Sequence, residues 1–393
     1  MKTAYIVAIV LTAAIIIAVV VKAVVVHVLR KKGREEVLKT CSIADGNTIF
    51  VSLVAVKDAT GAGATLHSLF KEARCPLRVH VGLCEIYNDD GDHADQISAV
   101  DVYKDLCSNS TSPFCLTDNI RVLRVPASEA HGAFAAREHI ERYLYRSETY
   151  VATFACPAAV SKHWDEYCVE TFTKLECQTA VLTTQLGPQE SGNAWACSVS
   201  QPGSYIGVTG TGPVVVNDQH INVPRFGGFR MKHVPTYRDG SDRQAVHTLP
   251  SIAWSSSFSF SLGIRIDDVP FPRNGTWPAD PLEDVIMTCR LLAAKWKLFC
   301  PTGCVGQTQA GGLPDTAGGP LPLQLHPDLA RAACITPEGM KALGVVNGRV
   351  SARARLGLSR APDEHELRGK IGSTTEYLSL LARIDLNPRK LET

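Results

Sequence analysis

Three groups of polar residues are the candidates for chemistry in this sequence. Glu283 and Asp284 are adjacent acids at the start of a predicted helix. A carboxylate there could orient or deprotonate a hydroxyl group, although acids in a first helical turn also compensate the helix dipole. The run DDGDH at residues 89–93 lacks the loop spacing of a calcium hand and is typical of a solvated turn, with a substitute metal ligand as the alternative. Cys300 and Cys304 have no second Cys/His pair at zinc-site spacing nearby.

Alternating apolar runs and amphipathic stretches predict the elements that position these residues. Residues 49–54 form a short run rich in β-branched side chains, which is typical of a strand covered on both faces. Helix-period segments then alternate with further apolar runs, at residues 79–84, 120–125, 150–155 and 180–184. This succession predicts an α/β fold with a doubly wound, mostly parallel sheet. Ligands should bind at the carboxyl ends of its strands.

Composition excludes some classes of protein and leaves the cysteines open. The chain has 393 residues and a net charge of +1, with acidic and basic residues mixed, so we expect no nucleic-acid partner. Its 13 cysteines could include a disulfide such as Cys107–Cys115, which would close a short loop. Most cysteines in apolar runs are better explained as buried thiols, namely Cys84, Cys156, Cys289 and Cys300.

The N-terminus is typical of a membrane anchor. Residues 5–21 are apolar except for Thr12, and the apolar pattern continues past Lys22 to a basic cluster at residues 30–34. A spanning helix needs roughly twenty apolar residues. The basic cluster favours a cytosolic C-terminal domain, whereas the sequons at Asn109 and Asn274 favour a lumenal one. We expect a single-pass protein whose globular domain faces a Golgi- or ER-like lumen, with the cytosolic face as the alternative.

Composition shifts divide the chain into four parts. We predict a transmembrane anchor at 1–30, a polar linker at 31–47, one globular domain at 48–335, and a C-terminal helical extension packed on it at 336–393. Residues 305–325 are rich in Gly, Pro and Gln and are predicted to form a loop. The sequence STTE at 373–376 is a candidate capping box for a helix in the extension.

The order of several segments resembles the family of polypeptide α-N-acetylglucosaminyltransferases, which act on hydroxyproline or on Ser/Thr. The resemblance spreads over most of residues 48–385. Its strongest segments are IFVSLVAVKD (49–58), HSLFKEARCPLRVHVGLCE (67–85), GAFAARE (132–138), SETY (147–150), HWD (163–165), AVLTT (180–184), IAWSSSFSFS (252–261), VPF (269–271) and LEDVIMTCRLLAAKWKLFCP (282–301). This resemblance implies a GT-A-like fold and a UDP-sugar donor, UDP-GlcNAc above all.

The resemblance also assigns roles to particular residues. Asp58 and the preceding Lys57 would contact the nucleotide, with a cap on the following helix as the alternative for Asp58. Arg137 would lie near the diphosphate, since a planar guanidinium suits phosphate oxygens, and a helix-surface ion pair is its alternative. Glu283 and Asp284 would be the catalytic acids on the acceptor side.

One motif of that family is missing. The family carries Asp-x-His at the end of the fourth strand, where this chain has Ala155-Cys156-Pro157. Magnesium and manganese prefer carboxylate oxygens, and neither Ala155 nor Pro157 offers one. A later histidine of the family is replaced, in this reading, by Gln307. We therefore predict no metal ligands at these positions.

Two functions follow from the resemblance and from the missing motif. The first is a membrane-anchored glycosyltransferase that moves GlcNAc or a related sugar from a UDP donor to a protein hydroxyl. It would work without the usual metal, with Arg137 or Lys57 on the diphosphate. The second is an inactive relative that keeps the fold for a binding or structural role, such as a membrane or virion-type scaffold.

Overall fold

A computed structural model gives the architecture. It describes residues 46–308 except 90–96, 110–114, 131, 189–197, 217–218, 232–235, 240–241, 246 and 272–281. It also describes Cys41, parts of 14–35 and the short strands β16 (Gln324–Leu325), β17 (Val345–Val346) and β18 (Arg349–Val350). The predicted capping box and nearly all of the predicted C-terminal extension lie outside the described residues, and so does most of the predicted loop at 305–325.

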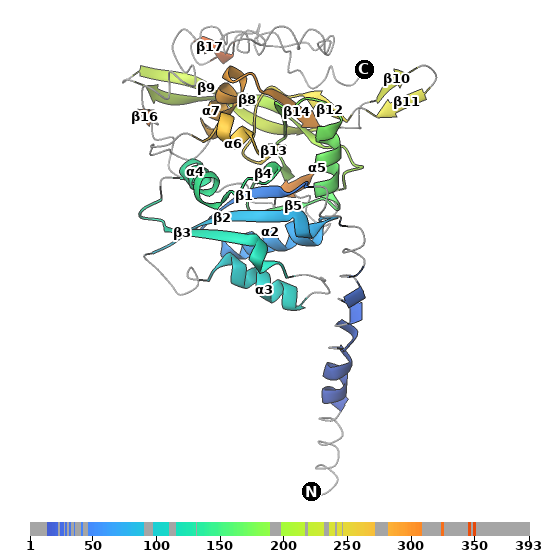
Figure 1. Ribbon diagram of the computed structural model, residues 1–393. Helices are drawn as coiled ribbons and strands as arrows, with labels where there is room; N and C mark the ends of the chain where they lie inside the picture. The colour runs from blue at the N-terminus through green and yellow to red at the C-terminus, as the bar shows by residue number, and fades with distance from the viewer. Residues whose placement is uncertain are drawn as a thin grey trace, which may run out of the picture.

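A central eight-stranded sheet organises the chain in the order β12-β14-β6-β13-β4-β1-β2-β3 (Figure 1). Strands β3, β2, β1, β4, β6 and β14 run in one direction, and β13 and β12 run against them. The strands are β1 (Ile49–Val56), β2 (Val79–Tyr87), β3 (Ile120–Pro126), β4 (Tyr150–Phe154), β6 (Ala180–Thr183), β12 (Thr248–Pro250), β13 (Phe258–Leu262) and β14 (Lys297–Pro301). The mostly parallel α/β fold is thereby confirmed.

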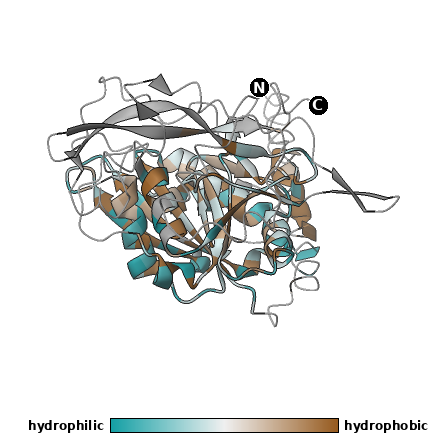
Figure 2. Cartoon of the chain, turned by 90° about the horizontal axis from the view of Figure 1, so that it is seen from above, coloured by the Kyte–Doolittle hydropathy of each residue, from teal (hydrophilic) through white to brown (hydrophobic). Residues whose placement is uncertain are grey.

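Helices cover both faces of this sheet. Alternate residues of β1 point to opposite faces, as the pleat requires. Ile49, Val51 and Leu53 belong to the larger core cluster, which the helices on one face complete. Phe50 and Val54 pack in a second cluster with Ile140 and its helix. The helices are α2 (Ala59–Lys71), α3 (Ala99–Asn109), α4 (Ala133–Leu144), α5 (Trp164–Thr173), α6 (Arg265–Asp268) and α7 (Leu282–Ala293). Figure 2 shows hydrophilic residues on the outer sides of helices and apolar residues inside.

Smaller sheets flank the central one. Strand β5 (Ala158–Val160) pairs with β15 (Gly306–Thr308), which also pairs with β7 (Gly187–Pro188). A long hairpin joins β8 (Ser204–Val216) to β9 (Gln219–Arg230), and β10 (Thr236–Asp239) pairs with β11 (Asp242–Ala245). The polar, Gly-rich composition of residues 187–250 predicts only edge strands, so the long hairpin exceeds that expectation. Cross-strand pairing compensates for the weak propensity of its glycines.

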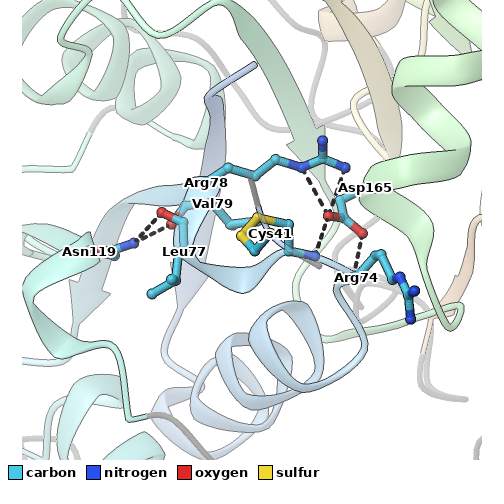
Figure 3. The surroundings of a disulfide bond; sticks show 8 residues. Cys41, Arg74, Leu77, Arg78, Val79, Asn119 and Asp165 are labelled. Carbon is cyan, nitrogen blue, oxygen red and sulfur yellow. Dashed lines mark hydrogen bonds and ion pairs between the residues drawn. A yellow bond between two sulfur atoms is a disulfide. The ribbon is translucent and has the colours of Figure 1, made fainter. Parts of the chain in front are cut away.

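A buried carboxylate and a disulfide hold the amino edge of the sheet (Figure 3). Asp165, which is completely buried, accepts hydrogen bonds from the backbone N–H of Arg74 at 2.6 Å and of Cys75 at 2.9 Å. It also forms an ion pair with the Arg78 guanidinium at 2.9 Å. Cys75 is joined to Cys41 with a Cα–Cα distance of 5.0 Å. The HWD segment thus has a structural role here.

The predicted Cys107–Cys115 disulfide is wrong. Cys107 is buried and Cys115 is exposed, and neither is disulfide-bonded. The residues that are bridged instead lie 34 positions apart, so short spacing was a poor guide. Cys84 and Cys300 are buried free thiols as predicted, and Cys156 is free and half-buried. The side chain of Cys289 lies outside the described residues.

The N-terminal segment is helical wherever it is described between residues 14 and 35. Its apolar side chains are exposed, among them Ile15, Ile17 and Val20. Within the described residues, none of the helices combines the length and the apolar character that a membrane span requires. Much of the predicted anchor, including residues 1–13, lies outside that part.

The carboxylate at the amino edge gives a stability prediction. Replacing Asp165 by alanine leaves the Arg78 cation and two backbone N–H groups without their acceptor, and we expect a loss of about 3–5 kcal/mol in unfolding free energy. Urea unfolding of the disulfide-intact protein measures it. Asp101→Ala is the control, because its ion pair with Lys104 is solvent-exposed and contributes about 1 kcal/mol or less. Equal losses of unfolding free energy in the two variants would contradict the stabilising role of Asp165.

Candidate functional site at the carboxyl edge of the sheet

The chain reverses its direction of winding between β1 and β4. Strand β2 lies on one side of β1, and β4 lies on the other. Helix α2 follows β1 on one face, while α4 packs on the opposite face. Ligands of open α/β sheets bind at such a point, outside the carboxyl ends of the strands. Lys57 and Asp58 follow β1 there, and residues 155–157 follow β4.

Asp58 caps the helix that follows it. Its Oδ1 accepts a hydrogen bond of 2.7 Å from the backbone N–H of Gly61, which satisfies an otherwise unpaired helical donor. A Cβ on Gly61 would lie 2.1 Å from Oδ2 of Asp58 and 2.8 Å from Cβ of Pro157. Asp58 and Pro157 are therefore packed around the same glycine. The capping alternative fits this geometry, and a nucleotide contact by Asp58 stays a prediction.

Polar side chains also follow the carboxyl ends of β1, β2 and β3. Lys57 has a left-handed backbone with φ 52°, and its exposed Nζ donates to Oδ1 of Asn88 at 3.2 Å. Asp89 accepts hydrogen bonds from both the backbone N–H and the hydroxyl of Ser128, and the hydroxyl bond above all lowers the pKa of Asp89. The rest of the DDGDH run lies outside the described residues.

Three of the predicted site residues meet in one buried cluster. Nε of Arg137, on α4, lies 2.7 Å from Oε1 of Glu283, at the start of α7. Nη2 of Arg137 donates to the carbonyl of Ser256 at 3.1 Å. The backbone N–H of Ser256 in turn donates to Oδ1 of Asp284 at 2.7 Å. Arg137 thus forms an ion pair between two helices, in the interior rather than on a helix surface.

One nitrogen of this guanidinium makes no hydrogen bond to any described residue. Within the described residues, Nη1 of Arg137 is buried and makes no hydrogen bond, on a side chain that is 6% exposed. Buried polar groups are nearly always paired in proteins, so an orphaned one calls for an explanation. Arg137 bonds the Ser256 carbonyl, and the next carbonyl, of Ser257, accepts from the backbone N–H of Ala155, which places the guanidinium near the end of β4.

Cys156 carries a neutral thiol. Burial of the sulfur raises its pKa to about 12, and the charge of Asp58 acts in the same direction. A hydrogen bond with Thr65 and the charge of Arg137 oppose this shift and are outweighed. Desolvation of the thiolate is thus the larger effect. A neutral thiol is a poor ligand for a hard cation.

The donor set does not fit a divalent cation. Ala155 and Pro157 carry no ligand atoms. Gln307 lies in β15, opposite Ala159 of β5, so the chain brings it close to residue 157 but supplies a neutral amide. In the part of the chain that the structure describes, no group of three or more His, Cys, Asp or Glu side chains could hold a metal ion. Mg²⁺ and Mn²⁺ prefer carboxylate oxygens, and neither residue 155 nor residue 157 supplies one.

A short loop before β13 connects these residues to the next strand. We call residues 255–257 the serine loop. The hydroxyl of Ser255 donates to Oε1 of Gln185 at 2.6 Å, and the backbone N–H of Ala155 donates to the carbonyl of Ser257 at 2.7 Å. Residues 252–261 had no predicted role beyond their place in the family resemblance. The unusual density of serines beside β13 was the available signal.

The fold is a mostly parallel α/β sheet with a polar cluster at its carboxyl edge. Residues 92–305, more than half of the chain, match the family described as Glycosyltransferase (GlcNAc). The chain belongs to this family. Resemblance to a glycosyltransferase family is thereby confirmed, while the polypeptide subfamily stays a prediction. No curated protein matches the chain.

Solved structures offer distant similarities. Crystal structures of GalNAc-T7 with UDP, GalNAc and Mn²⁺ share 12% identity, with a TM-score of 0.43, over 65% of this chain and 42% of that chain. S. aureus TarS 1–349 in complex with UDP-GlcNAc shares 9% identity, with a TM-score of 0.43, over 78% of this chain and 70% of that one. The chain thus spans less than half the length of GalNAc-T7.

The thiol at the site gives a pH prediction. With a pKa of about 12, Cys156 should be roughly 10⁻⁴ thiolate at pH 8, and its alkylation by iodoacetamide should rise about tenfold per pH unit. Mass spectrometry of native protein should show Cys115, which is exposed, modified first at pH 8. Both residues should react at similar rates in urea. Native labelling of Cys156 as fast as Cys115 at pH 8 would contradict a buried neutral thiol.

Proposed function

We propose that this protein binds a UDP-sugar, UDP-GlcNAc above all, at the β1–β4 edge without a divalent cation, and transfers the sugar to a protein hydroxyl. The observation that carries the proposal is the buried Nη1 of Arg137, which makes no hydrogen bond within the described residues and lies near the end of β4. A phosphate oxygen is the acceptor that a guanidinium fits best. Family membership supports the same class of substrate.

The pairing of Arg137 with Glu283 fixes the guanidinium and leaves part of it available. The ion pair uses Nε and the Ser256 carbonyl takes one N–H of Nη2, whereas a guanidinium has five N–H groups. Because Glu283 neutralises the charge, affinity for the diphosphate would rest on directed hydrogen bonds. The exposed Lys57 adds a mobile cation beside the end of β1.

Glu283 and Asp284 are the proposed catalytic carboxylates of the transfer, one of which acts as the base. The bond between the sugar C1 and the β-phosphate oxygen breaks, and a bond from C1 to the acceptor oxygen forms. The acceptor proton then passes to one of these carboxylates, and UDP leaves. Asp284 also holds Ser256, so its second function would be to position the serine loop.

A second candidate function has its own observation. Ala155 and Pro157 replace metal ligands, and Glu283 and Asp284 are both engaged within the protein. These features favour a protein that keeps the fold and binds a nucleotide sugar or a partner without transfer, as a membrane or virion-type scaffold would. Nucleotide binding without turnover is the result that this candidate requires.

We also propose that residues 1–30 anchor the protein in a membrane and that residues 31–47 link this anchor to a domain at 48–335, with 336–393 as an extension. The exposed apolar side chains between Ile15 and Leu29 support the anchor. The Cys41–Cys75 disulfide and the bonded state of Cys304 support an oxidising, lumenal compartment for the domain. A protein hydroxyl as acceptor and the absence of a nucleic-acid partner complete the proposal.

Calorimetry with UDP-GlcNAc tests the donor site. We expect the same affinity within about twofold in EDTA and in MnCl₂, because no ligand set bridges a cation to the diphosphate. Arg137→Lys should weaken binding roughly tenfold, since an ammonium cannot reproduce the fork. Arg142→Lys, on the exposed side of the same helix, is the matched control. Tighter binding of UDP-GlcNAc in MnCl₂ would contradict the metal-free site. Release of the sugar from UDP-GlcNAc, or its transfer to an acceptor, would rule out the inactive candidate.

A restoring double variant tests the register of the strand end. Ala155→Asp combined with Pro157→His returns an acid and an imidazole to the positions that the family uses. We expect UDP-GlcNAc binding in this variant to strengthen when MnCl₂ replaces EDTA, because both new side chains can ligate Mn²⁺. Each single variant is the control. If the double variant binds UDP-GlcNAc with the same affinity in MnCl₂ and in EDTA, residues 155 and 157 do not face the diphosphate.

A further inference from the structure

Gln185 stands one strand beyond the serine loop. It follows β6, whose neighbour in the sheet is β13. Strand β13 in turn separates β6 from β4, at whose end Ala155 and Cys156 lie. Neighbouring strands are about 4.8 Å apart, so Gln185 lies roughly 10 Å across the sheet edge from Ala155. That span matches one sugar ring with a side arm.

The side chain of Gln185 is oriented by its surroundings. Its Oε1 accepts the 2.6 Å hydrogen bond from Ser255, a buried residue whose backbone N–H donates to Oγ1 of Thr183 at 2.8 Å. On the other side the β9 backbone is close, because a Cβ on Gly228 would lie 2.8 Å from Cβ of Gln185. The carbonyl is thus engaged and the aliphatic part is packed, which directs the amide N–H groups away from Ser255.

The same loop holds the proposed diphosphate group. Ser256 accepts from Arg137 and donates to Asp284, and the adjacent Ser255 holds Gln185. The serine loop therefore binds the guanidinium through Ser256 and the carboxamide through the adjacent Ser255. Gln185 is half-buried, so a ligand can reach it.

We propose that Gln185 is the specificity-determining residue for the N-acetyl group of the donor sugar. Its amide N–H donates to the acetamido carbonyl of a UDP-GlcNAc whose diphosphate lies against Arg137. This inference rests on the proposed donor site and adds the part of the sugar that the site recognises. A sugar with a plain 2-hydroxyl, as in UDP-glucose, places no carbonyl there and leaves the amide N–H unpaired.

Calorimetry of the full chain with UDP, UDP-GlcNAc and UDP-glucose tests the assignment. We expect the wild type to prefer UDP-GlcNAc to UDP-glucose roughly tenfold. In Gln185→Leu the preference should fall to about twofold or less, with UDP affinity unchanged, because only the sugar contact is lost. Gln178→Leu, at an exposed position just before the same strand, is the matched control and should retain the preference.

A second variant guards against misfolding of the first. Gln185→Glu keeps an acceptor for Ser255 but has no amide N–H, so it should also lose the preference. If wild type binds UDP but prefers neither sugar, or if both variants keep the preference, the role of Gln185 is overturned and the donor site survives. If wild type binds none of the three nucleotides, the proposed function itself fails.

Discussion

The buried ion pair between Arg137 and Glu283 is the interaction on which the carboxyl edge depends. It joins α4, on one face of the sheet, to α7, and the same guanidinium holds the serine loop through Ser256. Both side chains are nearly buried, at 6% and 11% exposure. Taking two charges out of water is costly, and the pair survives only because each charge compensates the other. The pair therefore contributes to the fold by fixing how α4, α7 and the serine loop lie relative to one another.

A second buried pair continues the same network. Arg265 lies 2.5 Å from Glu141, and Glu141 also accepts from the backbone N–H of Phe271. Burial raises the pKa of Glu141, and the charge of Arg265 opposes the shift without cancelling it. Arg290 of α7 donates to the Pro270 carbonyl nearby. The VPF segment is thus held by side chains from two helices, α4 and α7.

The sequence predicted elements well and pairings poorly. Five predicted strands appear as β1, β2, β3, β4 and β6, because continuous apolar runs such as residues 49–54 have few other ways to bury their side chains. The helix α3 was not predicted because the apolar periodicity of its sequence is interrupted. The reversed direction of β13 was not predicted because an alternation of Ser and Phe indicates a strand but not its direction. Contacts between residues far apart in the chain could not be predicted, because the local sequence does not indicate the partner. Nothing local to Asp165 indicates Arg78, and nothing local to Arg137 indicates Glu283.

The Cys41–Cys75 disulfide at the amino edge affects how far the proposed donor site lies from the N-terminal segment. Cys41 is tied to the turn before β2, whereas the donor residues follow the far ends of β1 and β4. The eight residues of β1 put roughly 25 Å between these two poles. With an N-terminal helix inserted as proposed, the amino edge of the sheet would be the edge tied to the membrane anchor, and the proposed donor site would lie at the opposite edge. Such a geometry suits hydroxyl groups displayed on neighbouring macromolecules and disfavours lipid headgroups in the protein's own membrane.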